Sequence, residues 1–200
     1  MNQQQKSAQT QQLILDTAFQ LFYKNGFKAT SVDRVMKATQ LTKGAFYHHF
    51  KNKQELGVAV ITQRLQQRVY NSMIAPLYTE EYDTVEMLQT IFTQRIQSFS
   101  TEEKQAGCPA NNFINEIGDT EIAYQRALRR IIEEWKVALM AVLERGKTRQ
   151  QINLEINSEA VAVYLISAFE GVRGIRKLYH DDLILENYLE AVNRYIQQLR

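Results

Sequence analysis

Residues 30–56 read TSVDRVMKATQLTKGAFYHHFKNKQEL, and this stretch predicts two short helices joined by a tight turn. Thr30 and Asp33 have the spacing of a capping box, which indicates that the first short helix begins there. A four-residue break ending at Thr42 precedes the second helix, which Thr42 can cap and which runs to about His49. The pattern is therefore a helix, a tight turn and another helix.

A further helix is predicted on each side of this pair. Before it, a helix ends where Gly26 follows Asn25, as in a left-handed C-cap, and its apolar face consists of Ile14, Ala18, Leu21 and Phe22. After it, Asn52 and Glu55 repeat the capping-box spacing and open a longer helix toward Met73, with apolar positions at Leu56, Val60, Leu65 and Val69. We expect this longer helix to join two domains.

The rest of the chain also predicts helices, so the expected fold class is all-α. Only two prolines interrupt the 200 residues, and apolar positions recur at helical rather than alternating spacing. A chain of this length can bury a sizeable core. Five more helices are predicted, for about nine in all, over residues 84–101, 106–117, 120–147, 158–179 and 183–200, with breaks at Gly107, Gly118 and Gly146.

Charge is distributed unevenly along the chain, whose net charge is +2. The first 60 residues carry eight Lys or Arg and three acidic residues, for a net +5, so the remaining 140 residues have a net −3. A basic N-terminal part suits a polyanion such as nucleic acid, although ordinary solvated surface also carries lysine. The charge alone therefore favours nucleic acid and solvated surface about equally.

Several features indicate where the protein works. Cys108 is the single cysteine, which excludes an internal disulfide. The polar residues 1–10 show no signal-peptide pattern, and no run of 18 apolar residues occurs. We therefore expect a cytoplasmic protein that does not span a membrane.

The second short helix has the features of a helix that enters the DNA major groove. Its N-terminal end presents Lys43, Gly44 and Ala45, which are small or polar and let the backbone approach base edges. Ser31 and Thr42 stand at helix starts, where hydroxyls and free N–H groups bind phosphate oxygens. This end of the helix is expected to read DNA.

Polar and basic residues continue this surface. Tyr47 and His48 can donate to phosphates or bases while Phe46 and Phe50 pack inward. Basic residues at the start of the next helix add charge. The predicted DNA-binding set, within and just after the segment from Ser31 to Phe50, is Ser31, Thr42, Lys43, Gly44, Ala45, Tyr47, His48, Lys51 and Lys53.

The stretch 30–56, together with LILDTAFQLFYKNGF at 13–27, closely resembles the DNA-binding domain of the TetR family of regulators. The resemblance covers about the first third of the chain. It implies a three-helix helix-turn-helix domain, a connecting helix, and a helical domain for effector binding and dimerisation. Most members of the family repress transcription until an effector binds. One position departs from the pattern, because Gln40 stands in the tight turn where many members have glycine, so this turn must tolerate a side chain or shift its geometry.

The domains expected from this resemblance follow from the predicted helices. The DNA-binding domain covers residues 8–56 and continues into the connecting helix at 53–73, and the effector-binding and dimerisation domain covers 74–200. The implied partners are double-stranded operator DNA, an unidentified small-molecule effector and a second copy of the chain. No cofactor is expected.

The last two predicted helices carry apolar stripes that step by four and three residues. Such spacing forms a long seam against another helix, in the same chain or in a second copy. An ordinary internal core explains either stripe equally well, but two consecutive stripes favour a homodimer. The predicted interface residues are Val161, Leu165, Ala168, Val172, Leu185, Leu189, Val192 and Ile196.

An effector site is expected among aromatic and polar residues of the C-terminal half, by analogy with the family. Packed core is the alternative for most of the aromatic residues. The predicted set is Phe92, Phe99, Cys108, Asn112, Phe113, Trp135, Tyr164 and Phe169. The basic residues Arg173, Arg176 and Lys177 could bind an acidic effector, but a solvated helix face is the alternative.

The segment GCPANNFINEIGD at 107–119 resembles the GC-containing segment of a TetR subgroup that includes electrophile- and redox-responsive repressors. A helix N-terminus beside Cys108 could lower the pKa of its thiol and make it a sensor. A single cysteine is otherwise an inert small core residue. Both interpretations stay open from the sequence.

An enzyme is the competing class of function, and the sequence offers little for it. The three histidines are His48, His49 and His180, and the adjacent pair points to different sides of a helix. No metal-binding helix motif, glycine-rich phosphate loop or paired-cysteine spacing occurs. We expect neither catalytic residues nor a metal site. A helical interaction protein without DNA binding is a second alternative. The residues that argue against it are the intact Lys43, Tyr47, His48 and Lys53.

Overall fold

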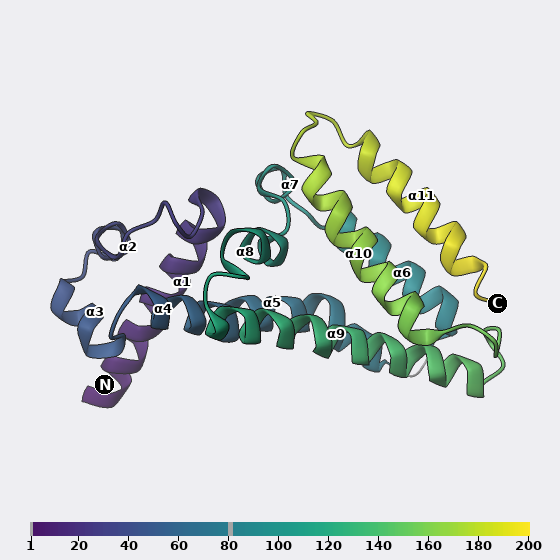
Figure 1. Ribbon diagram of the computed structural model, residues 1–200, viewed down its shortest axis with the longest axis horizontal. Helices are drawn as coiled ribbons and strands as arrows, with labels where there is room; N and C mark the ends of the chain where they lie inside the picture. The colour runs from purple at the N-terminus through teal and green to yellow at the C-terminus, as the bar shows by residue number, and fades with distance from the viewer. Residues whose placement is uncertain (1, 80–81) are drawn as a thin grey trace. The chain divides into compact units, whose positions relative to one another are not determined.

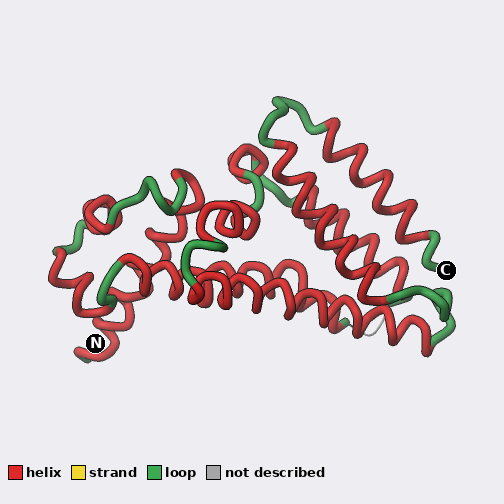
Figure 2. The backbone as a smooth tube through the Cα atoms, in the orientation of Figure 1, coloured by secondary structure: helices red, strands yellow, loops and turns green. Residues whose placement is uncertain are grey.

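The computed structural model of the chain describes residues 2–79 and 82–200, and this part contains helices and no strand (Figures 1 and 2). The expected all-α fold class is confirmed. The chain divides into two compact units. The first unit combines the residues up to Arg68 with Asn112–Arg129, and the second combines Val69–Asn111 with Arg130–Arg200. The division differs from the expected boundary near residue 74, because the segment 112–129 packs with the N-terminal helices.

The first unit is built around helix α1 (Gln3–Asn25). It contacts α2 (Val32–Thr39), α3 (Lys43–His49) and α4 (Lys53–Val60). Each of these helices buries apolar side chains in the core of the unit, which includes Ile14, Leu15, Ala18, Phe22, Val35, Met36, Phe46, Phe50, Leu56 and Val60. Short helices such as α2 and α3 are marginal alone, so burial of these side chains is what stabilises them.

The start of α2 differs by one residue from the predicted start. Ser31 is the N-cap, and its hydroxyl oxygen accepts the N–H of Arg34 at 3.1 Å. Thr30 is fully buried, and its hydroxyl donates to the carbonyl of Gly26 at 2.8 Å. The prediction that Thr30 caps the helix is wrong, because its side chain stabilises the preceding turn. The predicted cap at Thr42 is confirmed by its hydrogen bond from the N–H of Ala45 at 3.2 Å.

The turn between α2 and α3 places Gln40 in the left-handed region, with φ 58° and ψ 23°. Its N–H donates to the carbonyl of Lys37 at 3.3 Å, which closes the end of α2. A residue with a Cβ atom is strained in this conformation, whereas glycine is not. Of the two possibilities that the sequence left open, the turn therefore tolerates a side chain.

Replacing Gln40 with glycine is expected to raise the free energy of unfolding by about 0.5–1 kcal/mol, because it relieves this strain. Urea denaturation followed by circular dichroism measures the change. Lys37→Gly, inside α2, is the control and should lower the free energy of unfolding by about 1 kcal/mol. A Gln40→Gly variant that is no more stable than the parent protein would show that the turn stores no strain.

The helix after α3 is long, as predicted, but not regular. Asn52 caps it by accepting the N–H of Glu55 at 2.8 Å, while the Glu55 carboxylate accepts the N–H of Lys51 rather than that of Asn52. Beyond α4 the helical stretch contains two π-helical turns, and its segments are Ile61–Leu65 (π), α5 (Gln66–Val69), Tyr70–Ile74 (π) and a 3-10 turn, Ala75–Tyr78.

The remaining helices are α6 (Thr84–Gln97), α7 (Thr101–Ala106), α8 (Pro109–Ile117), α9 (Ile122–Thr148), α10 (Ser158–Arg176) and α11 (Leu183–Gln197). The predicted helix at 84–101 is two helices. Ser100 and Glu103 form a capping box that starts α7, a signal that the sequence contains and the prediction missed. Gly146 does not break α9, although the sequence predicted a break there. The glycine instead allows Thr84 to approach the helix closely, since an added Cβ would lie 2.7 Å from Thr84 Oγ1.

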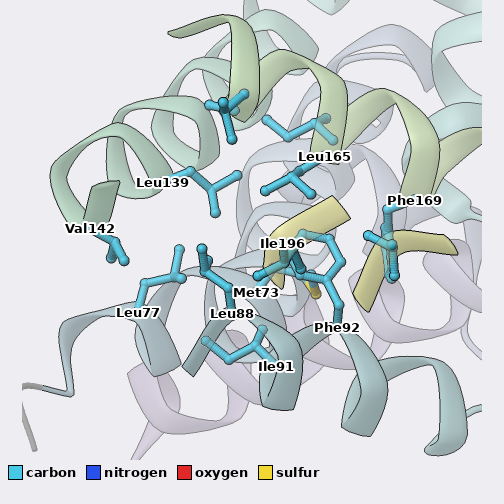
Figure 3. Packing of buried hydrophobic residues seen from close by; sticks show 14 of the residues in the cluster. Met73, Leu77, Leu88, Ile91, Phe92, Leu139, Val142, Leu165, Phe169 and Ile196 are labelled. Carbon is cyan, nitrogen blue, oxygen red and sulfur yellow. The ribbon is translucent and has the colours of Figure 1, made fainter. Parts of the chain in front are cut away.

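The core of the second unit lies between α6, α9, α10 and α11. Figure 3 shows Leu88 and Phe92 from α6, Leu139 from α9 and Leu165 from α10 gathered with Ile196 from α11. Helix α11 contacts both α6 and α10 within the chain. The buried apolar residues of the last two helices therefore have partners in the same unit.

This packing corrects the predicted dimer interface. Six of the eight residues are at most 7% exposed and belong to the internal core, namely Val161, Leu165, Val172, Leu185, Val192 and Ile196. Ala168 and Leu189 are half-buried, and Leu189 also packs against this core. The stripes form an internal seam, so the prediction that they contact a second copy is wrong for the six buried residues.

Candidate nucleic-acid interface

Helix α3 has one face in the core and one face in solvent. Phe46 is fully buried and Phe50 is 3% exposed, whereas Tyr47 is 63% exposed and His48 is also exposed. The Tyr47 ring rests edge-on against Phe46, with ring centroids 5.1 Å apart. Burial of the two phenylalanines fixes the helix while its outer face stays accessible.

The N-terminal end of α3 is open to close approach. An added Cβ at Gly44 would meet only the Thr42 hydroxyl, at 3.7 Å. Thr42 and Ser31 are exposed, and their oxygens each accept a backbone N–H of their own helix. Each hydroxyl keeps a proton that it can donate to a phosphate. Ala45 is half-buried on the same helix.

Two of the predicted lysines keep accessible charges. Lys43 forms an exposed ion pair with Asp33, with Nζ 2.9 Å from Oδ1. The hydrogen bond to Asp33 raises the pKa of Lys43, so Lys43 stays protonated at neutral pH. The side chain of Lys51 is exposed just after α3. An exposed pair such as Lys43 with Asp33 contributes little to stability and can be exchanged for a phosphate contact.

Lys53 has a different environment from the one predicted. Its ammonium group donates to the carbonyl of Phe27 at 2.6 Å and lies 4.3 Å from the centroid of the Phe27 ring. Partial burial lowers its pKa. The ammonium group is engaged with the turn after α1, so Lys53 has a structural role that the sequence did not predict.

These environments predict different effects of two substitutions on nucleic-acid binding. Lys51→Met should reduce the slope of log K against log salt concentration by about 1, because one phosphate contact is lost. Lys53→Met should leave the slope unchanged while loosening the turn that contains Phe27. Fluorescence anisotropy with duplex DNA over a series of salt concentrations measures both slopes. Equal losses of slope would show that Lys53 contacts phosphate after all.

The same turn receives a second contact that sequence reasoning missed. The carboxylate of Glu116, in α8, accepts the N–H of Phe27 at 2.7 Å and the N–H of Lys28 at 2.6 Å. Gly26, with φ 87°, brings the backbone close to this carboxylate, since an added Cβ would lie 3.2 Å from Glu116 Oε1. A glycine at a helix end signals the turn, but nothing in the sequence identifies a partner 89 residues away.

Four of the predicted effector residues meet in the second unit. Phe169 lies at the centre, with ring centroids 5.8 Å from Phe92, 6.3 Å from Phe99 and 5.6 Å from Trp135. All four side chains are buried. In the part of the chain that the structure describes, the Trp135 indole N–H has no hydrogen-bond partner, so it remains available for a polar group.

The other predicted effector residues do not join this aromatic group. Phe113 belongs to the first unit, where its ring lies 6.4 Å from that of Phe22. Asn112 also belongs to the first unit. Tyr164 is 47% exposed and packs against Tyr195, with ring centroids 4.4 Å apart.

Cys108 lies in a buried polar cluster with Glu170 and Arg173. The Arg173 guanidinium donates to the carbonyl of Gly107 at 3.0 Å and lies 4.1 Å from the Phe99 ring centroid. Burial, together with the neighbouring Glu170 carboxyl, raises the pKa of the Cys108 thiol to about 12. Burial also raises the pKa of the Glu170 carboxyl. The expectation that a helix N-terminus lowers the thiol pKa is therefore wrong, because burial outweighs it.

The alternative of a solvated basic face for Arg173, Arg176 and Lys177 is also wrong for the two arginines, which are 6% and 5% exposed. Arg176 forms an ion pair with Asp182, with Nη2 2.9 Å from Oδ1. Lys177 is exposed.

Cys108 is expected to react slowly with maleimides or disulfide reagents at pH 8 in the folded protein. A thiol with a pKa near 12 has on the order of a thousandfold less thiolate at this pH than an ordinary thiol, and only the thiolate reacts. Mass spectrometry of modified protein over time, with urea-unfolded protein as the reference, measures the ratio. Equally fast labelling in both states would contradict the buried, neutral thiol.

Among residues 2–79 and 82–200, no helix is long and apolar enough to cross a bilayer. Within the same described residues, no three His, Cys, Asp or Glu side chains are grouped so that they could hold a metal ion.

Comparison with known families gives two matches. Residues 14–60 match the family model described as bacterial regulatory proteins, tetR family. Residues 84–192 match the model described as tetracyclin repressor-like, C-terminal domain. The first match contains all of α2 and α3, and the second contains most of the remaining helices.

Similar proteins match over most of the chain. The transcriptional repressor DhaR of Mycobacterium sp. (strain GP1) is 23% identical over 181 residues, which cover 90% of this chain and 89% of that protein. The repressor NemR of Escherichia coli (strain K12) is 23% identical over 187 residues, or 94% of each chain. A crystal structure of a TetR-family regulator from Cytophaga hutchinsonii superposes with a TM-score of 0.87 at 23% identity, covering 98% of this chain and 96% of that one.

Proposed function

The chain belongs to the TetR family of bacterial regulatory proteins, and from this premise we propose that it is a transcriptional repressor that binds operator DNA through α2 and α3. The observation that carries the proposal is the division of α3 between a buried and an exposed face. Phe46 fixes the helix, and Lys43, Gly44, Tyr47 and His48 stand on the accessible side. A helix of this kind can enter the major groove and present side chains to base edges.

Phosphate contacts would hold the helix in register. The hydroxyls of Ser31 and Thr42 and the exposed Lys51 flank α3 and have the chemistry for this role. The net charge of +5 on the first 60 residues adds long-range attraction for DNA. A chain that binds operator DNA acts in the cytoplasm, where bacterial DNA lies.

The functional form is a homodimer, because two copies can read two half-sites of a palindromic operator. The outer side of α10 supports this proposal. Val163 and Ile175 are each 48% exposed, and an added Cβ at Gly171 would meet no atom within 4 Å. Tyr164, which is also exposed, is followed by Gly171 and Ile175 at steps of seven and four positions, so these three residues lie along one side of α10 with Val163 next to them, which suits a helix of a second copy.

A small-molecule effector would release the repressor from DNA by binding the second unit more tightly when the dimer cannot bind DNA. The aromatic group around Phe169 supports this location. Trp135 and Glu170 have buried polar atoms without partners among the described residues, and a ligand could satisfy these atoms. Cys108 lies beside Glu170 as a neutral thiol, so recognition would rest on packing and hydrogen bonds rather than on a thiolate.

The test begins with selection of duplexes that the purified protein retains from a random pool. Tyr47→Ala should then weaken binding to the selected operator about tenfold or more, because a base or phosphate contact is lost. Tyr78→Ala, an exposed tyrosine of the second unit, is the control and should leave affinity unchanged. Mobility shifts measure affinity, and titration against a known operator concentration measures stoichiometry, which should be two chains per site.

Two results would contradict the proposal. A protein that prefers no duplex even at low ionic strength is not a sequence-specific regulator. One chain per operator would contradict the dimer but not DNA binding itself.

A further inference from the structure

We propose that Glu116 is a positioning residue for operator binding, because its carboxylate fixes the turn that sets α2 against α1. The inference deepens the proposed function and rests on it. Glu116 itself lies outside the DNA-binding helices, in α8. Its two carboxylate oxygens accept the N–H groups of two successive residues, Phe27 and Lys28.

The turn depends on contacts from elsewhere in the chain for its polar groups. Glu116 satisfies the two N–H groups, and Lys53 donates to the carbonyl of Phe27 from the other side at 2.6 Å. The Thr30 hydroxyl donates to the carbonyl of Gly26 at 2.8 Å. If these contacts were lost, the backbone N–H and C=O groups of the turn would form hydrogen bonds with water instead, and the turn would change conformation.

The conformation of the turn controls the position of Ser31. Only Ala29 and Thr30 separate Lys28 from this N-cap residue, and Thr30 is fully buried. A connection of two residues is too short to absorb a shift of the turn, so such a shift moves the start of α2. If Ser31 were displaced, its hydroxyl would lose the phosphate contact proposed above. The movement of the start of α2 would also tilt α2 and α3.

Apolar contacts hold the segment 112–129 against the same turn. The Phe27 ring lies 5.5 Å from the ring of Tyr124, in α9. Gly57 leaves room for both rings, since an added Cβ would lie 2.8 Å from a Phe27 ring carbon and 2.9 Å from one of Tyr124. The apolar contacts of these rings hold the two segments together but do not orient them. The Glu116 carboxylate orients the turn, because its two oxygens must face two N–H groups.

A carboxylate suits this position better than its amide does. Glutamine would offer one carbonyl oxygen, and its NH2 group would face the second backbone N–H, donor against donor. Glu116→Gln therefore removes one contact while keeping the size of the side chain. Glu116→Ala removes both contacts.

The test measures affinity for the selected operator and for an unrelated duplex of equal length. Glu116→Ala is expected to weaken operator binding about tenfold or more and Glu116→Gln about threefold or more, with binding to the unrelated duplex changed less than about twofold. Asp119→Asn is the control: it removes an exposed negative charge three residues away and should leave operator affinity unchanged. Hydrogen exchange should accelerate at the amides of Phe27 and Lys28 in both Glu116 variants.

The outcomes are distinguishable. Faster exchange at these two amides with unchanged operator affinity in Glu116→Gln and Glu116→Ala would overturn the positioning role. Equal losses for operator and unrelated duplex, with a lowered thermal midpoint in Glu116→Gln, would also overturn it, because they indicate general unfolding. Failure of the unsubstituted protein to prefer any duplex would instead refute the proposed function.

Discussion

The structure of the first unit depends on a helix that must be held from one side only. Helix α3 has seven residues, too few to be stable in water alone. Burial of Phe46 and Phe50 stabilises this helix, so the residues on its opposite side do not need to pack against the core. The core that receives these rings comes from α1, α2 and α4, so the scaffold of the unit and the exposure of Tyr47 are two results of the same packing.

Much of this arrangement could be predicted from the sequence, because the signals are local. Hydroxyl and amide caps, a glycine at a helix end and apolar residues at helical spacing each act within a few residues. They predicted α3, the cap at Thr42, the side chain tolerated at Gln40 and the end of α1 at Gly26. The error at Thr30 shows the limit of such signals, since two adjacent hydroxyls have nearly the same spacing and only tertiary packing decides which one caps the helix.

The rest of the site could not be predicted, because it depends on contacts between distant parts of the chain. The sequence predicts Lys53 only as a surface charge, because its hydrogen bond to the carbonyl of Phe27 depends on tertiary packing. The stripes of the last two helices fit an internal seam as well as a dimer, and α6 occupies the place that a second copy was expected to take. Burial reversed the expected effect on Cys108, and the pairing of Glu116 with the turn has no local signal at all.

The composition of the first unit has a consequence for protein engineering. Segment 112–129 belongs to the same compact body as the N-terminal helices, although 43 residues of the second unit intervene in the chain. A fragment cut after α4 would expose the Phe27 ring where Tyr124 covers it and would leave two amides without acceptors. Chimaeras that graft these N-terminal helices onto another regulator should therefore also include segment 112–129, because the first unit is assembled from two separate parts of the chain.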